Sequence, residues 1–283
     1  MPSLAEFLKE AEIILRDAGI PEPAREASSL MQFAIAHDRT FVIAHPEYPL
    51  SNRETEVFES AVGRRAAREP FQYIVGKQEF FGLDFIVTPD VLIPRPETEI
   101  LVERAIEILD GRHGGRILEI GAGSGCISVA ILKNCPKVTA MAVDVSEQAI
   151  EVALRNASMH GVDGRLTLVL SDVYSEIGPE YFDLIVSNPP YVPETEIAGL
   201  QPEVRDHEPH LALTDGSTGL TIVERIVGGA FSRLSPHGHL LIEIGFGQAS
   251  AVREMFCENE WSSVEFHPDL QGIPRIIAAK SSK

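Results

Sequence analysis

Residues 1–75 carry apolar side chains at the spacing of amphipathic helices. In residues 4–15, and again in 27–35, apolar positions lie three or four residues apart, which places them on one helix face. Ser3 and Ser51 each stand three residues before a glutamate, the pattern of a capping box at a helix start. The pattern predicts a small helical bundle as an N-terminal domain.

Residues 78–93 are rich in aromatic and β-branched side chains and show no helical period. Pro89-Asp90 is typical of a turn and is expected to lie between two short strands. The segment 76–95 is therefore predicted to be a β-hairpin that connects two domains.

Residues 96–283 alternate short apolar runs with helical patterns, which favours an α/β domain with a doubly wound, mostly parallel sheet. The last two runs, 261–267 and 275–279, leave no room for a helix between them and are expected to pair antiparallel. The prediction is a seven-stranded sheet with an antiparallel C-terminal edge strand. The other predicted strands are 116–120, 138–144, 166–172, 182–187 and 239–245, and the predicted helices lie near 97–109, 125–133, 146–160 and 218–234.

Composition and charge narrow the function classes. No apolar run reaches the roughly 18 residues of a membrane span, and the acidic N-terminal stretch lacks the apolar core of a secretory signal. Three cysteines without a C-x-x-C pair fit free thiols in a reducing, cytoplasmic setting. The formal net charge is −18, and neither the first 90 residues nor the remainder is basic. A cationic surface for nucleic acid is therefore disfavoured.

A glycine-rich segment directly follows the first predicted strand of the sheet. Gly121, Gly123 and Gly125 have the spacing G-x-G-x-G, which differs from the G-x-G-x-x-G of dinucleotide-binding loops. Glycine lets the backbone approach a ligand closely, and the helix that follows presents free N–H groups. The segment is a candidate ligand cradle, although a turn needed only for packing has the same composition.

Two aspartates stand at the ends of the next two predicted strands. Asp144 follows Gly125 by 19 residues, a position from which a carboxylate can accept hydrogen bonds from both ribose hydroxyls of a nucleoside. The carboxylate of Asp172 could accept a hydrogen bond from the exocyclic amine of an adenine, with the Val173 backbone beside the ring. The alternative for both aspartates is a capping or turn role.

The sequence Asn188-Pro189-Pro190-Tyr191 follows the fourth predicted strand. Two prolines hold the chain extended and remove two backbone donors, which leaves the Asn188 side-chain oxygen and the Pro189 carbonyl as acceptors. Two acceptors in a rigid frame suit an NH2 group, and Tyr191 adds a flat face on which a planar amide or base can stack. The alternative is a proline-rich turn that only ends a strand.

With these motifs the chain resembles class I S-adenosylmethionine-dependent methyltransferases that methylate amino groups. More narrowly, it resembles the PrmC/HemK family of release factor glutamine N5-methyltransferases, over almost its whole length. Glu119 departs from the aspartate that many members carry, which replaces one acid by another. The motifs that carry the resemblance are Leu92–Glu99, Glu119–Gly125, Val143-Asp144, Ser187–Tyr191, Glu208-Pro209 with Ala212-Leu213, Glu243–Gly245, and Asp269-Leu270 with Gly272 and Arg275.

The resemblance implies a role for each motif. The glycine loop and the two aspartates would bind the cofactor S-adenosyl-L-methionine, which becomes S-adenosyl-L-homocysteine, and no metal is implied. The implied cofactor-binding residues are Gly121, Ala122, Gly123, Ser124, Gly125, Asp144, Asp172, Val173 and Asn188. The implied catalytic and substrate-binding residues are Asn188, Pro189, Pro190 and Tyr191.

By the same resemblance, the enzyme would methylate N5 of the glutamine in the Gly-Gly-Gln motif of class I peptide-chain release factors, which act in translation termination. Residues 1–75 would recognise that protein, and the enzyme is expected to be a monomer with no direct nucleic-acid partner and no membrane. The alternatives are a ribosomal-protein glutamine methyltransferase, a DNA or RNA base amino-methyltransferase, and a non-catalytic cofactor-binding module.

Four further side chains near these motifs receive no catalytic assignment from the sequence. Glu97 and Thr98 stand at a helix start, where acids are favourable, and contact of either with the cofactor stays open. His207 and His210, with Glu208 between them, are interpreted as residues that shape a loop and have no catalytic proton role.

Overall fold

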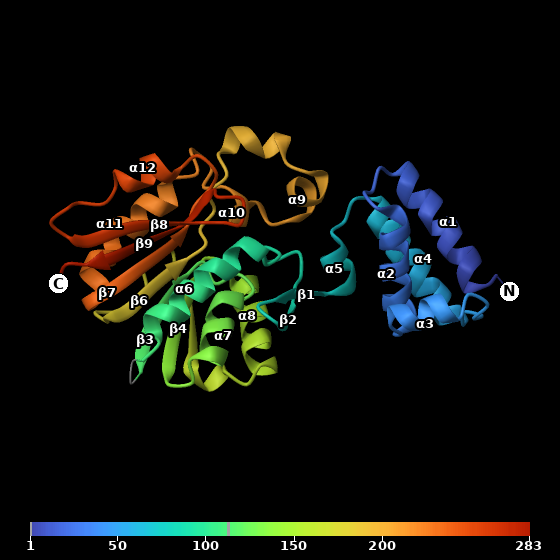
Figure 1. Ribbon diagram of the computed structural model, residues 1–283, viewed down its shortest axis with the longest axis horizontal. Coiled ribbons are helices and arrows are strands. Elements are labelled where there is room, and N and C mark those ends of the chain that lie inside the picture. The colour runs from blue at the N-terminus through green and yellow to red at the C-terminus, as the bar shows by residue number, and fades with distance from the viewer. Residues whose placement is uncertain (1, 112–113) are drawn as a thin grey trace. The chain divides into compact units, whose positions relative to one another are not determined.

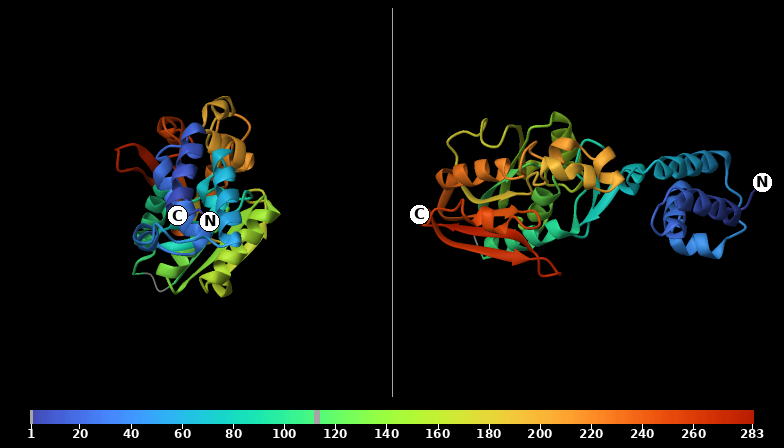
Figure 2. Two further views of the ribbon diagram at one scale, coloured as in Figure 1. Left: turned by 90° about the vertical axis from the view of Figure 1, so that its right-hand side faces the viewer. Right: turned by 90° about the horizontal axis from the view of Figure 1, so that it is seen from above.

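The apolar stripes near the N-terminus meet in a hydrophobic core of their own. Leu4, Leu15, Leu30, Met31 and Phe58 are buried together there. Both predicted capping boxes are formed, at the starts of the first and fourth helices. The helices of this unit, blue to cyan in Figures 1 and 2, are α1 (Leu4–Asp17), α2 (Pro23–Ile35), α3 (Arg39–Ala44), α4 (Asn52–Ala66) and α5 (Phe71–Val75).

The computed structural model describes residues 2–111 and 114–283, which divide into two units. The helical unit runs through Gly76 and also contains Gln201–His207. The second unit contains Lys77–Leu200 and Glu208–Lys283. The chain therefore leaves the second unit once, shortly after the Asn-Pro-Pro-Tyr sequence, and returns to it seven residues later.

The excursion forms a short helix, α9 (Pro202–His207), which an ion-pair network attaches to the helical unit. The buried guanidinium of Arg65 donates to Glu26 at 3.1 Å and to Glu203 at 3.0 Å. Arg68 donates to the other carboxylate oxygen of Glu203 at 2.8 Å. The sequence pattern predicts that residues 201–207 belong to the α/β domain of residues 96–283. Local periodicity does not indicate that their partners, Arg65 and Arg68, lie in the N-terminal helical unit.

The predicted hairpin exists, but its strands lie elsewhere than expected. β1 (Lys77–Phe80) and β2 (Leu83–Ile86) pair antiparallel around a turn at Phe81-Gly82, where both residues have positive φ. Pro89-Asp90 does form a turn, but no strand follows it, so the expectation of strands on both sides is wrong. Of the apolar residues after that turn, which suggested a strand, Val91 and Ile93 are instead buried as irregular chain, and Leu92 is partly exposed.

The second unit contains the predicted seven-stranded sheet, with the order β5-β4-β3-β6-β7-β9-β8. β3 through β7 pair parallel, whereas β9 pairs antiparallel with β7 and with β8. The fold class is confirmed. The last strand of the chain, β9, lies between β7 and β8, so β8 forms the edge of the sheet. The bounds are β3 (Gly115–Ile120), β4 (Val138–Asp144), β5 (Leu166–Leu170), β6 (Phe182–Ser187), β7 (Leu234–Glu243), β8 (Trp261–Pro268) and β9 (Pro274–Ser281).

Helices cover both faces of this sheet (Figure 1). Alternate strand residues face opposite ways, so Ile117 and Leu184 belong to one core while their neighbours Leu118 and Ile185 belong to the other. The first core also contains residues of α6 (Glu99–Leu109), α7 (Cys126–Asn134) and α8 (Glu147–Met159), and the second contains residues of α11 (Thr221–Arg233) and α12 (Ala249–Arg253). The 3-10 turn η1 (Pro96–Thr98) precedes α6, and α10 (His210–Leu213) follows α9.

The strand order changes direction at β3, which lies between β4 and β6. In open parallel sheets such a change leaves a crevice at the carboxyl ends of the strands, where ligands bind. The glycine loop follows β3, Asp144 ends β4 and Asn188 follows β6. The topology therefore brings the three predicted motifs to one edge of the sheet.

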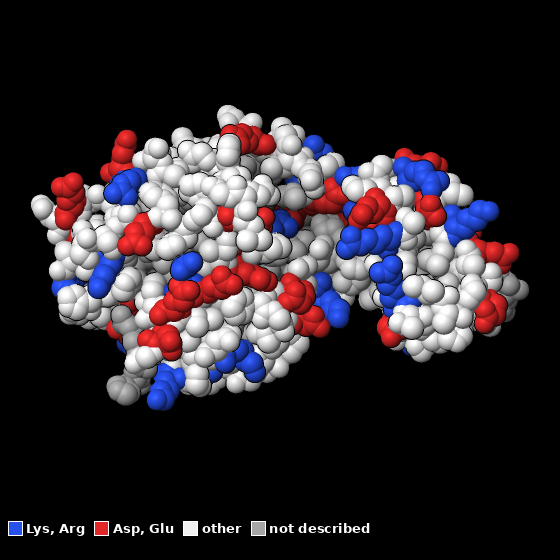
Figure 3. Space-filling view, viewed as in Figure 1, with Lys and Arg blue, Asp and Glu red and all other residues white. Residues whose placement is uncertain are grey.

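Acidic and basic side chains are interspersed on the face drawn in Figure 3, and a run of acidic side chains lies over helix α6. Among the described residues, no helix combines the length and the apolar character that crossing a bilayer requires.

Candidate active site

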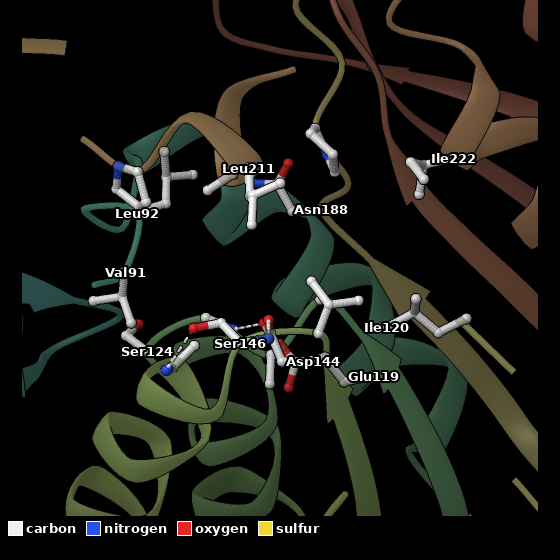
Figure 4. Close-up of a pocket in the computed structure, with 18 of the residues that line it drawn as sticks. Val91, Leu92, Glu119, Ile120, Ser124, Asp144, Ser146, Asn188, Leu211 and Ile222 are labelled. Carbon is white, nitrogen blue, oxygen red and sulfur yellow. Dashed lines mark hydrogen bonds between the residues drawn. The ribbon is translucent and has the colours of Figure 1, made fainter. Parts of the chain in front are cut away.

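A cavity of about 640 Å³ lies at the carboxyl edge of the sheet. Its size falls in the range of sites for small molecules and cofactors. In Figure 4, Glu119 and Asp144 lie at the ends of β3 and β4 on one side of the cavity, and Asn188 and Leu211 lie across from them. Residues from the segments 90–98 and 209–222 complete the wall.

The glycine loop is held by the neighbouring strand. The N–H groups of Gly121 and Ala122 both donate to the Val143 carbonyl at 2.9 Å. Gly121 and Gly123 have positive φ, a conformation that glycine adopts without the strain of a side chain. Gly121, Ala122, Gly123 and Ser124 all line the cavity.

Gly125, also predicted to bind the cofactor, is not among the residues that line the cavity. It caps α7 with positive φ, and a Cβ there would lie 3.1 Å from the Ala153 Cβ. Gly125 therefore lets α7 and α8 approach each other and starts the helix below the loop.

Asp144 anchors the loop as well as facing the cavity. Its Oδ2 accepts the Gly123 N–H at 2.8 Å, and its Oδ1 accepts the Ser146 N–H at 3.0 Å. Burial raises the pKa of the carboxyl, and the backbone donors oppose that shift. Each oxygen keeps a further lone pair for a ligand hydroxyl.

Asp172 and Val173 also line the cavity. β5 ends at Leu170, two residues before the predicted end, so Asp172 lies in the loop that follows. Its carboxylate is half-exposed and accepts a hydrogen bond from Arg225 at 2.8 Å. Val173 is buried with φ 56°.

Asn188 lines the cavity with its amide orientation fixed by one contact. Its Nδ2 donates to Thr98 Oγ1 at 3.0 Å, which leaves Oδ1 available as an acceptor. Pro190 also lines the cavity, whereas Pro189 and Tyr191 are not among the lining residues. β6 itself is tied to β3 because the Ser187 hydroxyl donates to the Ile120 carbonyl at 2.7 Å.

Tyr191 lies behind the cavity wall, where its hydroxyl donates to Glu243 Oε1 at 3.1 Å. Burial raises the pKa of this tyrosine well above its usual range. Glu243 Oε2 accepts the Thr98 hydroxyl at 2.7 Å. The sequence left Thr98 open and gave Glu243 no role, although an acid directly after the apolar residues 240–242 could have marked it as a candidate.

Glu119 is, like Glu243, a buried acid, but it lines the cavity itself; the sequence assigned it to no ligand. Its Oε2 accepts the Ser128 N–H at 3.0 Å, and Oε1 has no hydrogen-bond partner among the described residues. Burial raises the pKa of Glu119 to about 8. In its ionised form, the unsatisfied oxygen in the cavity wall suits a cationic ligand group, and such a group would in turn favour ionisation of Glu119.

We expect stability to depend on pH through these buried acids. Burial raises the pKa of Glu119 from 4.5 to about 8 and that of Glu243 from 4.5 to about 7. Between these pKa values the folded protein holds protons that the unfolded chain has released. The free energy of unfolding should therefore fall as the pH rises from about 5 to 8. The fall should reach up to about 1.4 kcal/mol per pH unit for each group. Urea unfolding of wild type and Glu119→Gln across this range tests it. The variant should show the shallower fall, and parallel curves would rule out this role for Glu119.

The histidines near the Asn-Pro-Pro-Tyr sequence do not gather into one site. His210 lines the cavity, with its Nε2 3.6 Å from Glu194 Oε1, whereas His207 lies in α9 of the helical unit. Glu208 is buried, pairs with Arg95 and accepts the Ile93 N–H at 3.2 Å. In the chain as described, no three His, Cys, Asp or Glu side chains are grouped so as to hold a metal ion.

Gly219 packs directly against the chain that carries Asn188. It has φ +77°, and a Cβ there would lie 2.1 Å from the Tyr191 carbonyl oxygen. Gly216, in the same loop, has φ +73° but open space around it. A comparison of substitutions at the two glycines can therefore separate the cost of backbone strain from the cost of a steric clash.

We expect Gly219→Ala to destabilise the protein more than Gly216→Ala. Both changes should incur the left-handed backbone cost of about 1–2 kcal/mol, but only Gly219→Ala adds an overpacking cost of about 1–3 kcal/mol. Urea unfolding of both variants measures the difference. Equal destabilisation would mean that the contact with Tyr191 relaxes freely.

Comparison with known proteins finds matches for both units. Residues 6–76 match the family model of the PrmC N-terminal domain, and residues 97–200 match that of the methyltransferase small domain. The release factor glutamine methyltransferase of Geobacter sulfurreducens is 42% identical over 94% of this chain and 92% of that protein. The protein of the same name from Cereibacter sphaeroides is 42% identical over 98% of each chain.

Solved structures share the fold at low sequence identity. The hMettl16 catalytic domain, solved with an RNA hairpin, matches with a TM-score of 0.58 and 16% identity, over 81% of this chain and 82% of that chain. A methyltransferase from Pyrococcus furiosus matches with a TM-score of 0.53 and 19% identity, over 82% of this chain and 98% of that chain. At these identities the likeness concerns the fold alone.

Proposed function

Because this chain belongs to the family of release factor glutamine methyltransferases, we propose that it methylates a glutamine side-chain nitrogen, N5, in a class I peptide-chain release factor. The methyl donor is S-adenosyl-L-methionine. The observation that carries the proposal is the fixed amide of Asn188, whose Oδ1 is available at the wall of a cofactor-sized cavity.

The cavity residues fit this methyl donor. Gly121 to Ser124 offer a backbone that a ligand can approach closely, and Asp144 retains lone pairs for ribose hydroxyls. The unpartnered Oε1 of Glu119 suits a cationic group of the donor. Asp172 and Val173 line the cavity at the positions proposed for the adenine.

When bound, S-adenosyl-L-methionine supplies an electrophilic methyl group on a positively charged sulfur. The amide nitrogen of glutamine is a poor nucleophile because its lone pair is delocalised into the carbonyl. Asn188 Oδ1 and the Pro189 carbonyl accept its two hydrogens, which favours a localised lone pair and stabilises the positive charge that develops on nitrogen. The rigid proline frame also orients the nitrogen for attack. The surplus proton leaves to water after transfer, so no strong base is required beforehand.

Recognition of the protein substrate is proposed for the helical unit. It has its own buried core, and residues 6–76 match the PrmC N-terminal domain. Helix α9 belongs to this unit, where Glu203 pairs with the buried guanidinium of Arg65. We expect the enzyme to act as a monomer, which its elution volume in size-exclusion chromatography would report.

Methyl transfer from labelled S-adenosyl-L-methionine to purified release factor, ribosomal protein and duplex DNA, side by side, tests the proposal. We expect label only on release factor, at one glutamine located by mass spectrometry, and weaker turnover of a short peptide that carries the same Gly-Gly-Gln sequence. Label on ribosomal protein or on DNA would favour the corresponding alternative. Cofactor binding with no transfer to any substrate would favour a binding module.

A further inference from the structure

We propose that Thr98 and Glu243 are positioning residues for methyl transfer, because together they determine which atom of the Asn188 amide faces the substrate. This inference rests on the function proposed above. The three residues come from separate elements: Thr98 ends η1, Asn188 follows β6, and Glu243 ends β7. They meet as a continuous hydrogen-bonded chain at the wall of the cavity.

The direction of each hydrogen bond follows from the groups involved. An ionised carboxylate has only acceptors, so the single hydrogen of the Thr98 hydroxyl points to Glu243 Oε2, at 2.7 Å. The Thr98 oxygen can then only accept, and it accepts from Asn188 Nδ2 at 3.0 Å. The amide is thereby held with its NH2 group toward Thr98, and Oδ1 remains for the NH2 group of the substrate. The opposite orientation would present a donor where an acceptor is needed.

The other oxygen of Glu243 is fixed as well. Glu243 Oε1 accepts the Tyr191 hydroxyl at 3.1 Å, so the carboxylate holds both ends of the Asn-Pro-Pro-Tyr sequence, one of them through Thr98. Thr98 and Glu243 are each only 2% exposed. Water therefore has little access to compete for these hydrogen bonds, and the chain favours a single arrangement.

The groups around Glu243 shift its pKa in opposite directions. Burial raises its pKa to about 7, the hydroxyls of Thr98 and Tyr191 and the positive charge of Arg275 oppose that rise, and Glu97 adds to it. A proton on Oε2 would let Glu243 donate to Thr98, whose hydroxyl would then donate to the amide and favour the reversed Asn188. Acidic pH should therefore weaken the productive orientation.

A pair of variants at Thr98 separates positioning from packing. Thr98→Val keeps the shape and removes the hydroxyl, whereas Thr98→Ser keeps the hydroxyl and removes a methyl group. We expect the valine variant to lower kcat on release factor by about 10–100-fold. This loss is smaller than the decrease of about 10²–10³-fold expected when the Asn188 acceptor itself is removed. The serine variant should recover most of kcat, and neither should change KM for S-adenosyl-L-methionine by a comparable factor. The reverse order, with valine active and serine impaired, would show that Thr98 acts by packing and would overturn the proposal.

A measurement on the protein without substrate tests the same arrangement. In ¹⁵N-labelled protein the side-chain NH2 signal of Asn188 can be assigned by its loss in Asn188→Ala. We expect slow hydrogen exchange of this group in wild type and Thr98→Ser and faster exchange in Thr98→Val. Equal exchange in all three proteins would contradict the hydrogen-bonded chain.

Glu243→Gln provides the pH test, since glutamine keeps the shape but does not titrate. In wild type, kcat should fall as the pH drops below about 7, and the glutamine variant should have a lower kcat without this acidic limb. An unchanged limb would exclude Glu243 as its source. A wild-type enzyme inactive on release factor would refute the proposed function instead, while the exchange measurement would still decide the positioning role.

Discussion

Asn188→Ala is expected to lower the rate of methyl transfer by about 10²–10³-fold, the usual effect of removing one preorganised polar group from a catalytic site. The change removes Oδ1, the acceptor that remains free at the cavity while Nδ2 is held by Thr98. The backbone frame of Pro189 and Pro190 stays in place. Affinity for the cofactor should change much less, because the glycine loop and Asp144 do not depend on this side chain.

Single-turnover rates at saturating cofactor measure this effect without a contribution from product release. Asn188→Asp is the informative partner variant, because it keeps an acceptor and adds negative charge near the sulfonium. It also loses the NH2 donor to Thr98 Oγ1. We expect only partial activity from it. Near wild-type transfer by the alanine variant would mean that the Asn-Pro-Pro-Tyr sequence is structural here and that the proposed mechanism is wrong.

Asp144→Ala is expected to weaken cofactor binding by about 1–3 kcal/mol, the range for loss of a charge-assisted hydrogen bond. The change removes the proposed ribose acceptor and also the carboxylate that holds the Gly123 and Ser146 N–H groups. Both losses act on the cofactor side of the cavity, so the effect should appear mainly in affinity.

Calorimetric titration with S-adenosylhomocysteine gives this difference directly, with a parallel titration of NAD. Asp172→Ala is the matched control, because Asp172 also lines the cavity but is half-exposed and already paired with Arg225. Its effect should be smaller. Tighter binding of NAD than of S-adenosylhomocysteine by wild type would refute the cofactor assignment.

The local order of the chain was predictable from sequence. The strands β4 and β6 have the predicted bounds, and both capping boxes form, because periodicity and capping depend on residues only a few positions apart. The predicted position of the hairpin turn, at Pro89-Asp90, was wrong because the local sequence gives no signal for the turn at Phe81-Gly82. Phe81 takes a positive φ that its residue type seldom adopts, so nothing in its immediate sequence marks the turn.

The sequence by itself determined the fold class and the three motifs at the carboxyl edge of the sheet, since strand order and motif position follow from local patterns and from the rules of parallel sheets. Only the tertiary structure decided which side chains support those motifs. Thr98 and Glu243 meet because η1 and the end of β7 pack beside β6, and Arg65 meets Glu203 because residues 201–207 belong to the helical unit. Each of these contacts joins residues more than a hundred positions apart. No local period encodes such a pair. It forms only when the packing of whole elements brings two polar groups together away from water, where each needs a hydrogen-bond partner.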